Sequence, residues 1–439
     1  MNKKLMALAV AGAVTAPGLA FAQVGGSPGV TLYGRLDSTI MNSKYSVSGD
    51  GVVSEVKKGD VFSPGNAMGV RGREDLGGGT AVWFQLESGV WPDGRLDSAA
   101  TSGQHFGGRN SGLGVSSDLG DIMFGGWDQP YKLVDGTWNS LTSGGFSAAG
   151  IIMNNGDTTG ALNNALCQTT LSNTSGSIGV TAPARNSCVT EATGNGTAWS
   201  RRTNNSIQYW SPVFAGLQFR LGTALANYQS PGNAAFASGA PKPKVWSGSL
   251  TWARGPVSVG AGYESHEGLR PGTAAGAVAN PKDTAMQIGA KFNFGIGEVG
   301  AGYEQLKYGD NGTSAAPAGG MKVPAMVVNG RINAGPGAVW ASFSKTPGGK
   351  SCSTATTTIG SASCGIVAKQ TTIGYDYIMS KRTKMYVAYN KIDNGFSNGV
   401  GTNYYYIAGP AGNNSNGTAS GVLIGTDVTT IGVGIQHTF

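Results

Sequence analysis

The amino-acid sequence predicts an all-β fold: a transmembrane, antiparallel, up-and-down β-barrel of about sixteen strands with long extracellular loops and short periplasmic turns. Three observations predict it. Short segments of alternating apolar and polar residues recur from residue 30 onward, long and tight connections alternate strictly between them, and the chain finishes on a strand-like segment ending in an aromatic residue.

The final segment, residues 427–439, has the clearest strand pattern. Its apolar face at every second position consists of Ile431, Val433, Ile435, His437 and Phe439, and the intervening residues are Thr, Gly and Gln. This alternation is typical of a strand between an apolar and a polar medium. A free edge on such a strand would promote aggregation, so we expect it to pair with the first strand and close the barrel.

The connections between the predicted strands are of two kinds. The tight ones lie at 74–79, 117–120, 211–216, 254–256, 295–297, 334–337 and 380–383. The long ones, rich in Gly, Ser, Thr and Asn, lie around 42–65, 92–106, 129–201, 229–242, 266–281, 309–321, 347–365 and 394–426. Tight periplasmic turns and long extracellular loops alternate in this way in barrels of the outer membrane.

The alternation also predicts which side chains face the barrel interior. In the first strand Val30, Leu32 and Leu36 would face lipid, whereas Tyr33 and Arg35 would point inward with Asp37. Other predicted inward residues are Glu87, Gln218, Arg220, Glu264, Gln287, Lys291, Glu304 and Asp376. A polar interior in a barrel of about sixteen strands leaves room for water, so the pattern predicts a channel.

Residues 1–22 read as a signal peptide. Lys3 and Lys4 precede an apolar stretch and an Ala-Phe-Ala cleavage site at 20–22, so we expect one barrel domain at 23–439. Only 13% of the residues are charged, and 9 Trp and 15 Tyr recur along the chain, as a lipid-facing wall with aromatic interfaces requires. The formal net charge is +7, but an exported chain without a Lys/Arg run does not indicate nucleic-acid binding.

The cysteines are Cys167, Cys188, Cys352 and Cys364, and no histidine lies near them. An even count in an oxidising compartment indicates disulfides rather than a metal site. Three connectivities are possible. Sequential pairing is the simplest, because each pair then lies within one long connection, where closing the loop would contribute about 3 kcal/mol.

Several motifs resemble the trimeric porins of the neisserial and burkholderial type. They are residues 30–34 (VTLYG), 69–77 (GVRGREDLG), 204–217, 374–383 (GYDYIMSKRT) and 432–439 (GVGIQHTF). The resemblance implies a homotrimer in the bacterial outer membrane, in contact with its lipid and lipopolysaccharide, and a third loop, here 129–201, folded into the lumen. It also implies that Phe439 and its strand are read by the barrel-assembly machinery.

In these porins a row of wall arginines faces acids on the infolded loop. By position in the motifs, Arg71, Arg109 and Arg202 match that row, whereas Trp127 stands where relatives often have an arginine. Arg35 and Arg220, inward by alternation, could compensate, and Asp128 and Asp135 lie closest to where the infolded loop would begin. This arrangement predicts a general diffusion channel for small hydrophilic solutes, with a mild preference for anions.

Other classes of function have weaker support. The three histidines, His105, His266 and His437, show no arrangement typical of catalysis, so we expect neither an enzyme nor a cofactor or metal site. Gly-x-Gly strings are frequent, as 73 glycines make inevitable, and none opens a helix as a nucleotide site requires. Two alternatives remain: a substrate-specific channel whose long third loop holds a solute, and a surface-recognition (adhesin) barrel with a plugged lumen.

Overall fold

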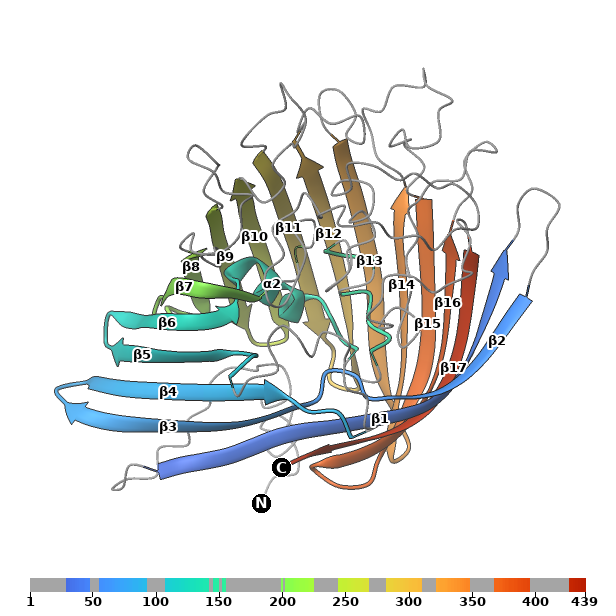
Figure 1. Ribbon diagram of the computed structural model, residues 1–439, viewed down its shortest axis with the longest axis horizontal. Coiled ribbons are helices and arrows are strands. Elements are labelled where there is room, and N and C mark those ends of the chain that lie inside the picture. Colours follow the sequence, from blue (N-terminus) through green and yellow to red (C-terminus); the bar gives the residue numbers. More distant parts are fainter. Residues whose placement is uncertain are drawn as a thin grey trace, which may run out of the picture.

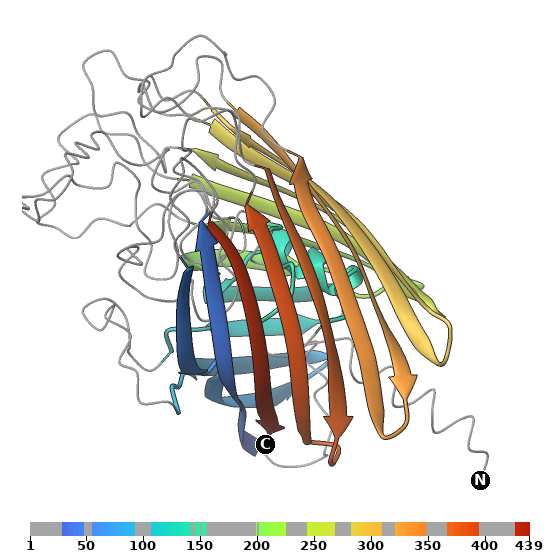
Figure 2. The same cartoon turned by 90° about the vertical axis from the view of Figure 1, so that its right-hand side faces the viewer.

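The fold is a closed antiparallel β-barrel (Figures 1 and 2). This computed structural model describes residues 29–47, 55–92, 107–141, 145–149, 152–154, 199, 202–224, 244–267, 282–309, 321–347, 367–394 and 426–439. The strands are β1 (Gly29–Val47), β2 (Glu55–Phe62), β3 (Ala67–Gly77), β4 (Thr80–Gly89), β5 (Ser111–Ser117), β6 (Gly120–Asp128), β7 (Arg202–Trp210), β8 (Leu217–Ala224), β9 (Lys244–Arg254), β10 (Val257–Glu267), β11 (Lys282–Asn293), β12 (Gly297–Tyr308), β13 (Met321–Ala334), β14 (Gly337–Pro347), β15 (Val367–Ile378), β16 (Thr383–Asn394) and β17 (Thr426–Thr438).

The last strand closes the ring by pairing with the first, as the sequence predicts. β17 runs antiparallel to β1 from Arg35 opposite Thr438 to Val47 opposite Thr426. Beyond this ladder, the Gly34 N–H donates to the Phe439 carbonyl and the Phe439 N–H donates to the Gly34 carbonyl, both at 3.1 Å. The terminal aromatic residue is therefore part of the seam, and no strand edge remains open there.

The second barrel strand is divided in two. β2 pairs with the upper part of β1 (Thr39 opposite Phe62), and β3 pairs with the lower part (Arg35 opposite Ala67). β2 and β3 thus form one wall position interrupted at 63–66, so seventeen segments make a barrel of sixteen strands. The prediction that 42–65 forms a loop was wrong, because 42–47 and 55–62 continue the ladder.

Side-chain hydrogen bonds replace the ladder at this interruption. Arg35 Nη2 donates to the Gly65 carbonyl at 2.8 Å, and Asn66 Nδ2 donates to the Asp37 carbonyl at 3.0 Å. The Asp37 N–H in turn donates to Asn66 Oδ1 at 2.5 Å. Buried backbone groups that lose their ladder partners need such replacements, so the break is stabilised locally.

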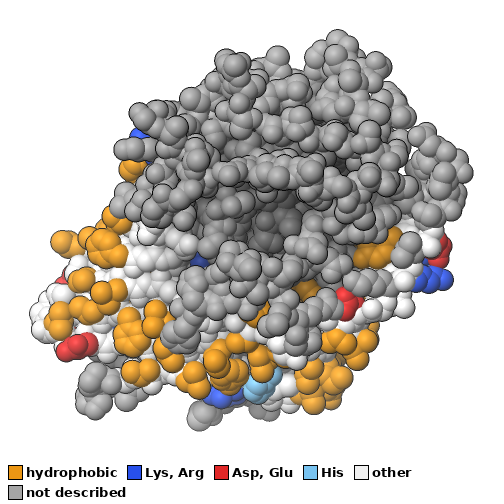
Figure 3. Space-filling model, in the orientation of Figure 1, with side chains coloured by type: hydrophobic (Ala, Val, Ile, Leu, Met, Phe, Trp, Pro, Cys, Tyr) orange, Lys and Arg blue, Asp and Glu red, His pale blue; other side chains and the backbone are white. Residues whose placement is uncertain are grey.

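The outer wall is apolar and the two rims differ. Val30, Leu32, Ile431 and Val433 are 50–67% exposed, as their alternation predicts, and hydrophobic side chains cover much of the visible outer wall (Figure 3). One rim carries the tight turns, including Gly255 with φ +59°, and we call it the tight-turn rim. We call the other the long-connection rim. No helix among the described residues is both long and apolar enough to cross a membrane.

Candidate functional site

After β6 the chain turns into the barrel (Figure 1). A short helix, α2 (Pro130–Leu133), and a 3₁₀ turn, η1 (Val134–Thr137), follow directly. Pro130 opens the helix, where its missing N–H has no partner to lose. We call the described residues 129–141, 145–149, 152–154 and 199 the infolded segment. They are parts of the predicted third loop, 129–201.

Glycines on the inner wall make room for the infolded segment. A Cβ added to Gly260 would lie 2.7 Å from Thr137 Cγ2, and one added to Gly289 would lie 2.8 Å from Trp138 Cβ. At Gly300 an added Cβ would collide with the backbone carbonyl of Trp138. The Trp138 side chain is completely buried. Glycine is therefore required on β10, β11 and β12 to let the segment pack directly on the sheet.

Buried hydrogen bonds fix the segment on this wall. Glu304 of β12 accepts from the Tyr131 hydroxyl and from the Asn154 N–H, both at 2.8 Å. Asp135 accepts from Gln287 Nε2 at 2.9 Å and from Asn154 Nδ2 at 3.0 Å. Because a buried polar group is costly without its partner, these bonds select one position for the segment.

The far end of the segment reaches the other side of the seam. Leu141 and Phe146 are buried in an apolar cluster with Met41, Phe62, Trp340, Tyr386 and Ala388. The Phe146 carbonyl also accepts from Gln370 Nε2 at 3.1 Å. The described part of the segment therefore lines the inner wall from β7, where Gln129 Nε2 donates to Thr203 Oγ1, round to β1 and β2, and none of its described contacts reaches the wall of β3–β5.

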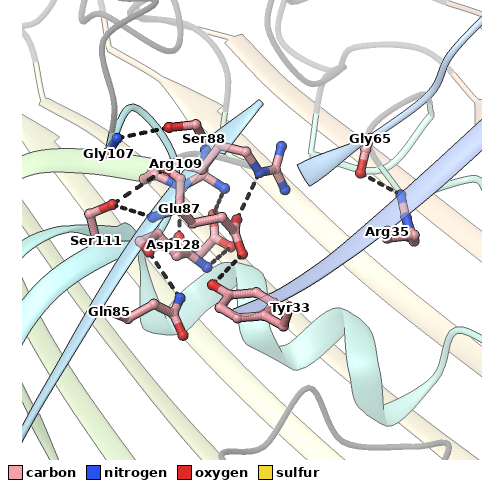
Figure 4. Close-up of polar contacts among 12 residues, drawn as sticks. Tyr33, Arg35, Gly65, Gln85, Glu87, Ser88, Gly107, Arg109, Ser111 and Asp128 are labelled. Carbon is pink, nitrogen blue, oxygen red and sulfur yellow. Dashed lines mark hydrogen bonds and ion pairs between the residues drawn. The ribbon is translucent and has the colours of Figure 1, made fainter. Parts of the chain in front are cut away.

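Tyr33 and Glu87 hold two arginines, Arg71 and Arg109, on that wall, and Figure 4 shows Tyr33, Glu87 and Arg109. The Arg71 guanidinium lies 4.9 Å above the centre of the Tyr33 ring, and the Tyr33 hydroxyl donates to Glu87 Oε2 at 3.0 Å. The other Glu87 oxygen accepts from Arg109 Nε at 2.7 Å, and the Arg109 side chain is 32% exposed. Arg109 uses only its Nε in this bond, so the outer edge of its guanidinium stays available to the lumen.

Arg202 belongs to a neighbouring ionic group. Its Nη2 lies 3.3 Å from Asp128 Oδ1, and its Nε donates to Asn110 Oδ1 at 2.6 Å. Lys132 of α2 lies 3.0 Å from the same Asp128 oxygen. The arginine is only 9% exposed. Asp128 is thus paired with two cations where the infolded segment begins. Arg202 is largely buried in this ionic group, so it contributes little to the surface of the lumen.

The other predicted site residues lie elsewhere. Figure 4 shows Arg35 apart from the Glu87 group, with its guanidinium on the strand interruption. The Arg220 guanidinium lies 5.3 Å from the Trp210 ring centre, and its Nε donates to Gln218. The structure therefore gathers Arg71, Arg109 and Arg202 with Asp128 into one region, and it places Arg35 and Arg220 outside it.

Asp135 also differs from the expected arrangement. Its carboxylate is bonded to Gln287 and Asn154 at the interface with the wall, although the residue keeps partial exposure. Burial of the carboxyl group raises the pKa of Asp135 to about 7. At neutral pH much of its negative charge is therefore absent, so it is a weak counterpart to the arginines.

Sequence reasoning missed a tryptophan cluster on the inner wall. The rings of Trp83, Trp127 and Trp210 lie 5.6–5.8 Å apart, with Met123 against them. Trp127, which takes the place of an arginine in the resemblance, is 7% exposed here. The available signal was that Trp83 and Trp210 fall on inward positions of their strands. Sequence reasoning also missed the role of Gly260, Gly289 and Gly300 in receiving the infolded segment, because glycine strings are expected by chance in a chain with 73 glycines.

Some predicted features lie outside the described residues. These are the signal peptide at 1–22 and all the cysteines, Cys167, Cys188, Cys352 and Cys364. Phe439, by contrast, belongs to the described residues: it lies at the seam, and the centre of its ring is 6.4 Å from that of the His437 ring.

Comparisons with known proteins agree with this architecture. The model of the Gram-negative porin family matches residues 7–397. The major outer membrane protein P.IB of Neisseria gonorrhoeae is 31% identical over 148 residues, which are 34% of this chain and 38% of that protein. Outer membrane porin protein 32 of Delftia acidovorans is 30% identical over 265 residues, which are 60% of this chain and 59% of that protein. The chain thus spans less than two thirds of either relative.

Solved structures show the same fold. An anion-selective porin from Comamonas acidovorans covers 94% of this chain and all of its own, with a TM-score of 0.63 at 20% identity. OmpT of Vibrio cholerae, solved in a trimer form, matches with a TM-score of 0.55 at 13% identity, and the match covers 94% of this chain and all of OmpT. The barrel, its infolded segment and the family match lead to one assignment. The chain belongs to the Gram-negative porin family, whose place is the outer membrane.

Proposed function

We propose that this protein is a passive, water-filled diffusion channel for small hydrophilic solutes and ions, with a mild preference for anions. The observation that carries the proposal is the pair Arg71 and Arg109 on the wall opposite the infolded segment, held in place by Tyr33 and Glu87. Cations fixed in a narrow, low-dielectric passage raise the local concentration of anions and slow cations. The Comamonas relative is itself described as anion-selective.

The acids near these arginines are mostly engaged. Glu87 is shared by Tyr33 and Arg109, and Asp128 is paired with Arg202 and Lys132. The positive charge of Arg71 has no such carboxylate partner among the described contacts. This imbalance supports a mild preference rather than a strict one. The porin family and its fold are those of channels, so we propose no catalytic activity and no cofactor.

Liposome swelling with uncharged sugars of increasing size tests the channel itself. We expect the swelling rate to fall steadily with solute size and to rise linearly with solute concentration. Saturable swelling with one solute would replace general diffusion with a substrate-specific channel. A folded barrel that admits no sugar would favour the surface-recognition alternative, with a plugged lumen.

We further propose that the functional unit is a homotrimer whose contact surface lies on β3–β8. Outward residues there, such as Leu113, Val115 and Phe124, are apolar and exposed in the single chain, and these strands contain no lysine. The similar OmpT structure is described as a trimer. Cleavage after Ala22, disulfides within the long connections, contact with lipopolysaccharide and delivery by the barrel-assembly machinery through Phe439 stay predictions.

A further inference from the structure

The interruption between β2 and β3 contains one residue more than the strand opposite it. The ladder with β1 is lost between Phe62 and Ala67, where residues 63–66 face residues 36–38 of β1. We call residues 63–66 the wall break. An extra residue in one strand bends that strand and re-aims its side chains. The wall break can therefore present a side chain to the lumen in a way that a regular strand cannot.

The infolded segment packs on the wall break. We call residues 145–149 of this segment the tip. A Cβ added to Gly145 would lie 3.2 Å from Pro64 Cβ and 3.5 Å from Phe62 Cε1. Gly145 has a φ of +68°, a left-handed conformation that glycine adopts without strain. Phe146 beside it is completely buried, in the same apolar cluster as Phe62. The tip therefore rests on Pro64 and on the end of β2.

Among the described residues, the tip has fewer polar contacts with the wall than the start of the segment. The start, residues 129–141, is tied to β9, β10, β12 and β13 by hydrogen bonds. At the tip, the Phe146 carbonyl accepts from Gln370 Nε2 at 3.1 Å and from Thr372 Oγ1 at 3.3 Å, and apolar contacts supply the rest of the described attachment. Apolar attraction is non-directional, so the position of the tip depends on where the wall break holds Pro64.

Two side chains hold the wall break in place. Arg35 Nη2 donates to the Gly65 carbonyl at 2.8 Å and to the Pro64 carbonyl at 3.3 Å, and Figure 4 shows the guanidinium at Gly65. The Asn66 side chain exchanges two hydrogen bonds with the backbone of Asp37, at 2.5 and 3.0 Å. A Cβ added to Gly65 would collide with Arg35 Nη2, so the guanidinium comes this close because the residue is glycine. Arg35 thus spends these contacts on the backbone of the wall break.

We propose that Arg35 and Asn66 are positioning residues for the constriction: they hold the wall break, the wall break holds the tip, and the two loosen as one unit. Arg35 then acts on the channel through Pro64 and Gly145 and not through its charge. The steadiness of the passage is set at the wall break, whereas its preference for anions is set by Arg71 and Arg109. The proposal rests on the proposed channel function for its effect on current, but the link between wall break and tip does not depend on conduction.

Single-channel recordings of Asn66→Ala and Arg35→Gln test the effect on current. Both variants remove hydrogen bonds to the wall break, and only the second removes a charge. We expect the fraction of time in reduced-conductance states to rise roughly threefold to tenfold in both, because losing a hydrogen bond of ordinary strength shifts an equilibrium by about that factor. Asn66→Ala should keep the wild-type reversal potential in a KCl gradient. More frequent closures with a changed reversal potential in Asn66→Ala would contradict the separation of steadiness from selectivity.

Two control variants match these substitutions. Ser43→Ala removes a buried hydrogen bond with Thr430 from the regular part of β1, and Arg220→Gln removes an inward charge away from the wall break. Both should keep the wild-type frequency of closures. Closures that increase equally in the controls would show that any loss on the inner wall has this effect, and the proposal would fall.

A double variant tests whether the wall break and the tip act as one unit. Phe146→Ala removes the ring that packs beside Phe62. Effects of two substitutions within one coupled unit are not additive. The double variant Asn66→Ala with Phe146→Ala should therefore close about as often as Phe146→Ala alone. Closures that increase by the product of the two single effects would mean that the wall break and the tip are independent.

Hydrogen–deuterium exchange gives a readout that needs no conduction. In Asn66→Ala the amides of residues 145–149 should exchange faster together with those of residues 63–66, while those of α2 keep the wild-type rate. Unchanged exchange at the tip, or faster exchange throughout the infolded segment, would overturn the proposal. A wild-type protein that never conducts would contradict the channel, and this exchange experiment would still decide the role of the wall break.

Arg35→Lys covers the case in which Asn66→Ala does not fold. Lysine keeps the positive charge but lacks the planar fork that serves two carbonyls at once. We expect Arg35→Lys to close more often than the wild type at an unchanged reversal potential, with faster exchange at the tip. A wild-type record and wild-type exchange in this variant would assign the role of Arg35 to its charge and would contradict the proposal.

Discussion

Arg71 and Arg109 show how a carboxylate, that of Glu87, can lie beside an anion path without removing the attraction of the arginines for anions. Glu87 accepts hydrogen bonds from Arg109 Nε and from the Tyr33 hydroxyl, and the Tyr33 ring makes a cation–π contact with the Arg71 guanidinium. A guanidinium has five N–H donors in a rigid fork, so the donors not used by Glu87 can still meet an anion. The single acid thus orients one arginine directly and the other through the tyrosine.

Replacing both arginines should weaken the anion preference. We expect Arg71→Gln with Arg109→Gln to lower the permeability ratio of chloride to potassium roughly two- to fivefold, because each removed charge changes the local energy of an ion by about 1 kcal/mol or less in a wet passage. Reversal potentials in a KCl gradient measure this ratio. Arg220→Gln, which removes a charge stacked on Trp210, is the control. An equal change in the control would mean that Arg71 and Arg109 have no special place on the path.

Docking of the infolded segment should depend on pH through Asp135. Its pKa is raised to about 7 by burial, so protonation favours the docked state. This contribution is complete below the ordinary carboxyl pKa of about 4 and is lost as pH rises through about 7. Lys132 attracts the ionised form, whereas Asp128 and the nearby Glu304 repel it.

Current fluctuations in planar bilayers should therefore increase between pH 5 and pH 9 as the segment loosens. The uncharged variant Asp135→Asn should lose most of this rise, whereas Asp393→Asn on the outer face should keep it. Fluctuations that rise equally in the Asp135→Asn variant would assign the pH dependence to other groups.

At the scale of elements, the contact between the infolded segment and the β10–β12 wall depends on missing side chains. Gly300→Ala would drive a Cβ into the Trp138 carbonyl, a backbone atom that cannot rotate away. We expect this variant to fold as a barrel but to displace the segment, changing the single-channel conductance. Gly248→Ala is the matched control, because its Cβ would make only ordinary contacts, at 3.5 Å to Leu221 Cδ2 and 3.8 Å to the Arg220 carbonyl oxygen. The same conductance in both variants would mean that the glycines of β10–β12 do not position the infolded segment.

The strands were predictable because each alternates between lipid and the barrel interior. Ile431 and Val433 could be placed outward and Glu304 inward from period-two patterns alone. β2 could not, because its sequence, Glu55–Phe62, is rich in charge and glycine and its pairing depends on the upper half of β1. Its sequence pattern is typical of a loop, and it forms a strand only because it pairs with β1.

The site was predictable where position in a strand decides it. Arg71 faces inward on β3 by the same rule as Tyr33 on β1. The fate of Asp135 could not be read from the chain, since its partners Gln287 and Asn154 are distant in sequence and meet only after the segment packs on the wall. Contacts between a loop and a remote wall carry no local pattern.

At the scale of the whole molecule, the barrel has two different outer faces. One, from β9 through the seam to β2, carries exposed lysines near the long-connection rim, among them Lys307, Lys322 and Lys369, and the other, β3–β8, contains no lysine. This asymmetry supports the proposal that the second face, and not the first, contacts a second copy of the chain.

Matched substitutions can test the proposed subunit contact. Leu113 on β5 and Val328 on β13 are both 56% exposed in the single chain. If β3–β8 form the contact, Leu113→Gln should lower the temperature at which the oligomer dissociates in detergent gels, and Val328→Gln should leave it near that of the wild type. Equal shifts, or the absence of any oligomer before boiling, would contradict a homotrimer built on this face.

Conductance of the refolded protein in a planar bilayer under a KCl gradient tests the central claim most directly. We predict discrete insertion steps and a reversal potential whose sign shows that chloride passes more readily than potassium. Steps that carry mainly potassium would contradict the role of Arg71 and Arg109, and a folded, inserted barrel without any steps would contradict the channel itself.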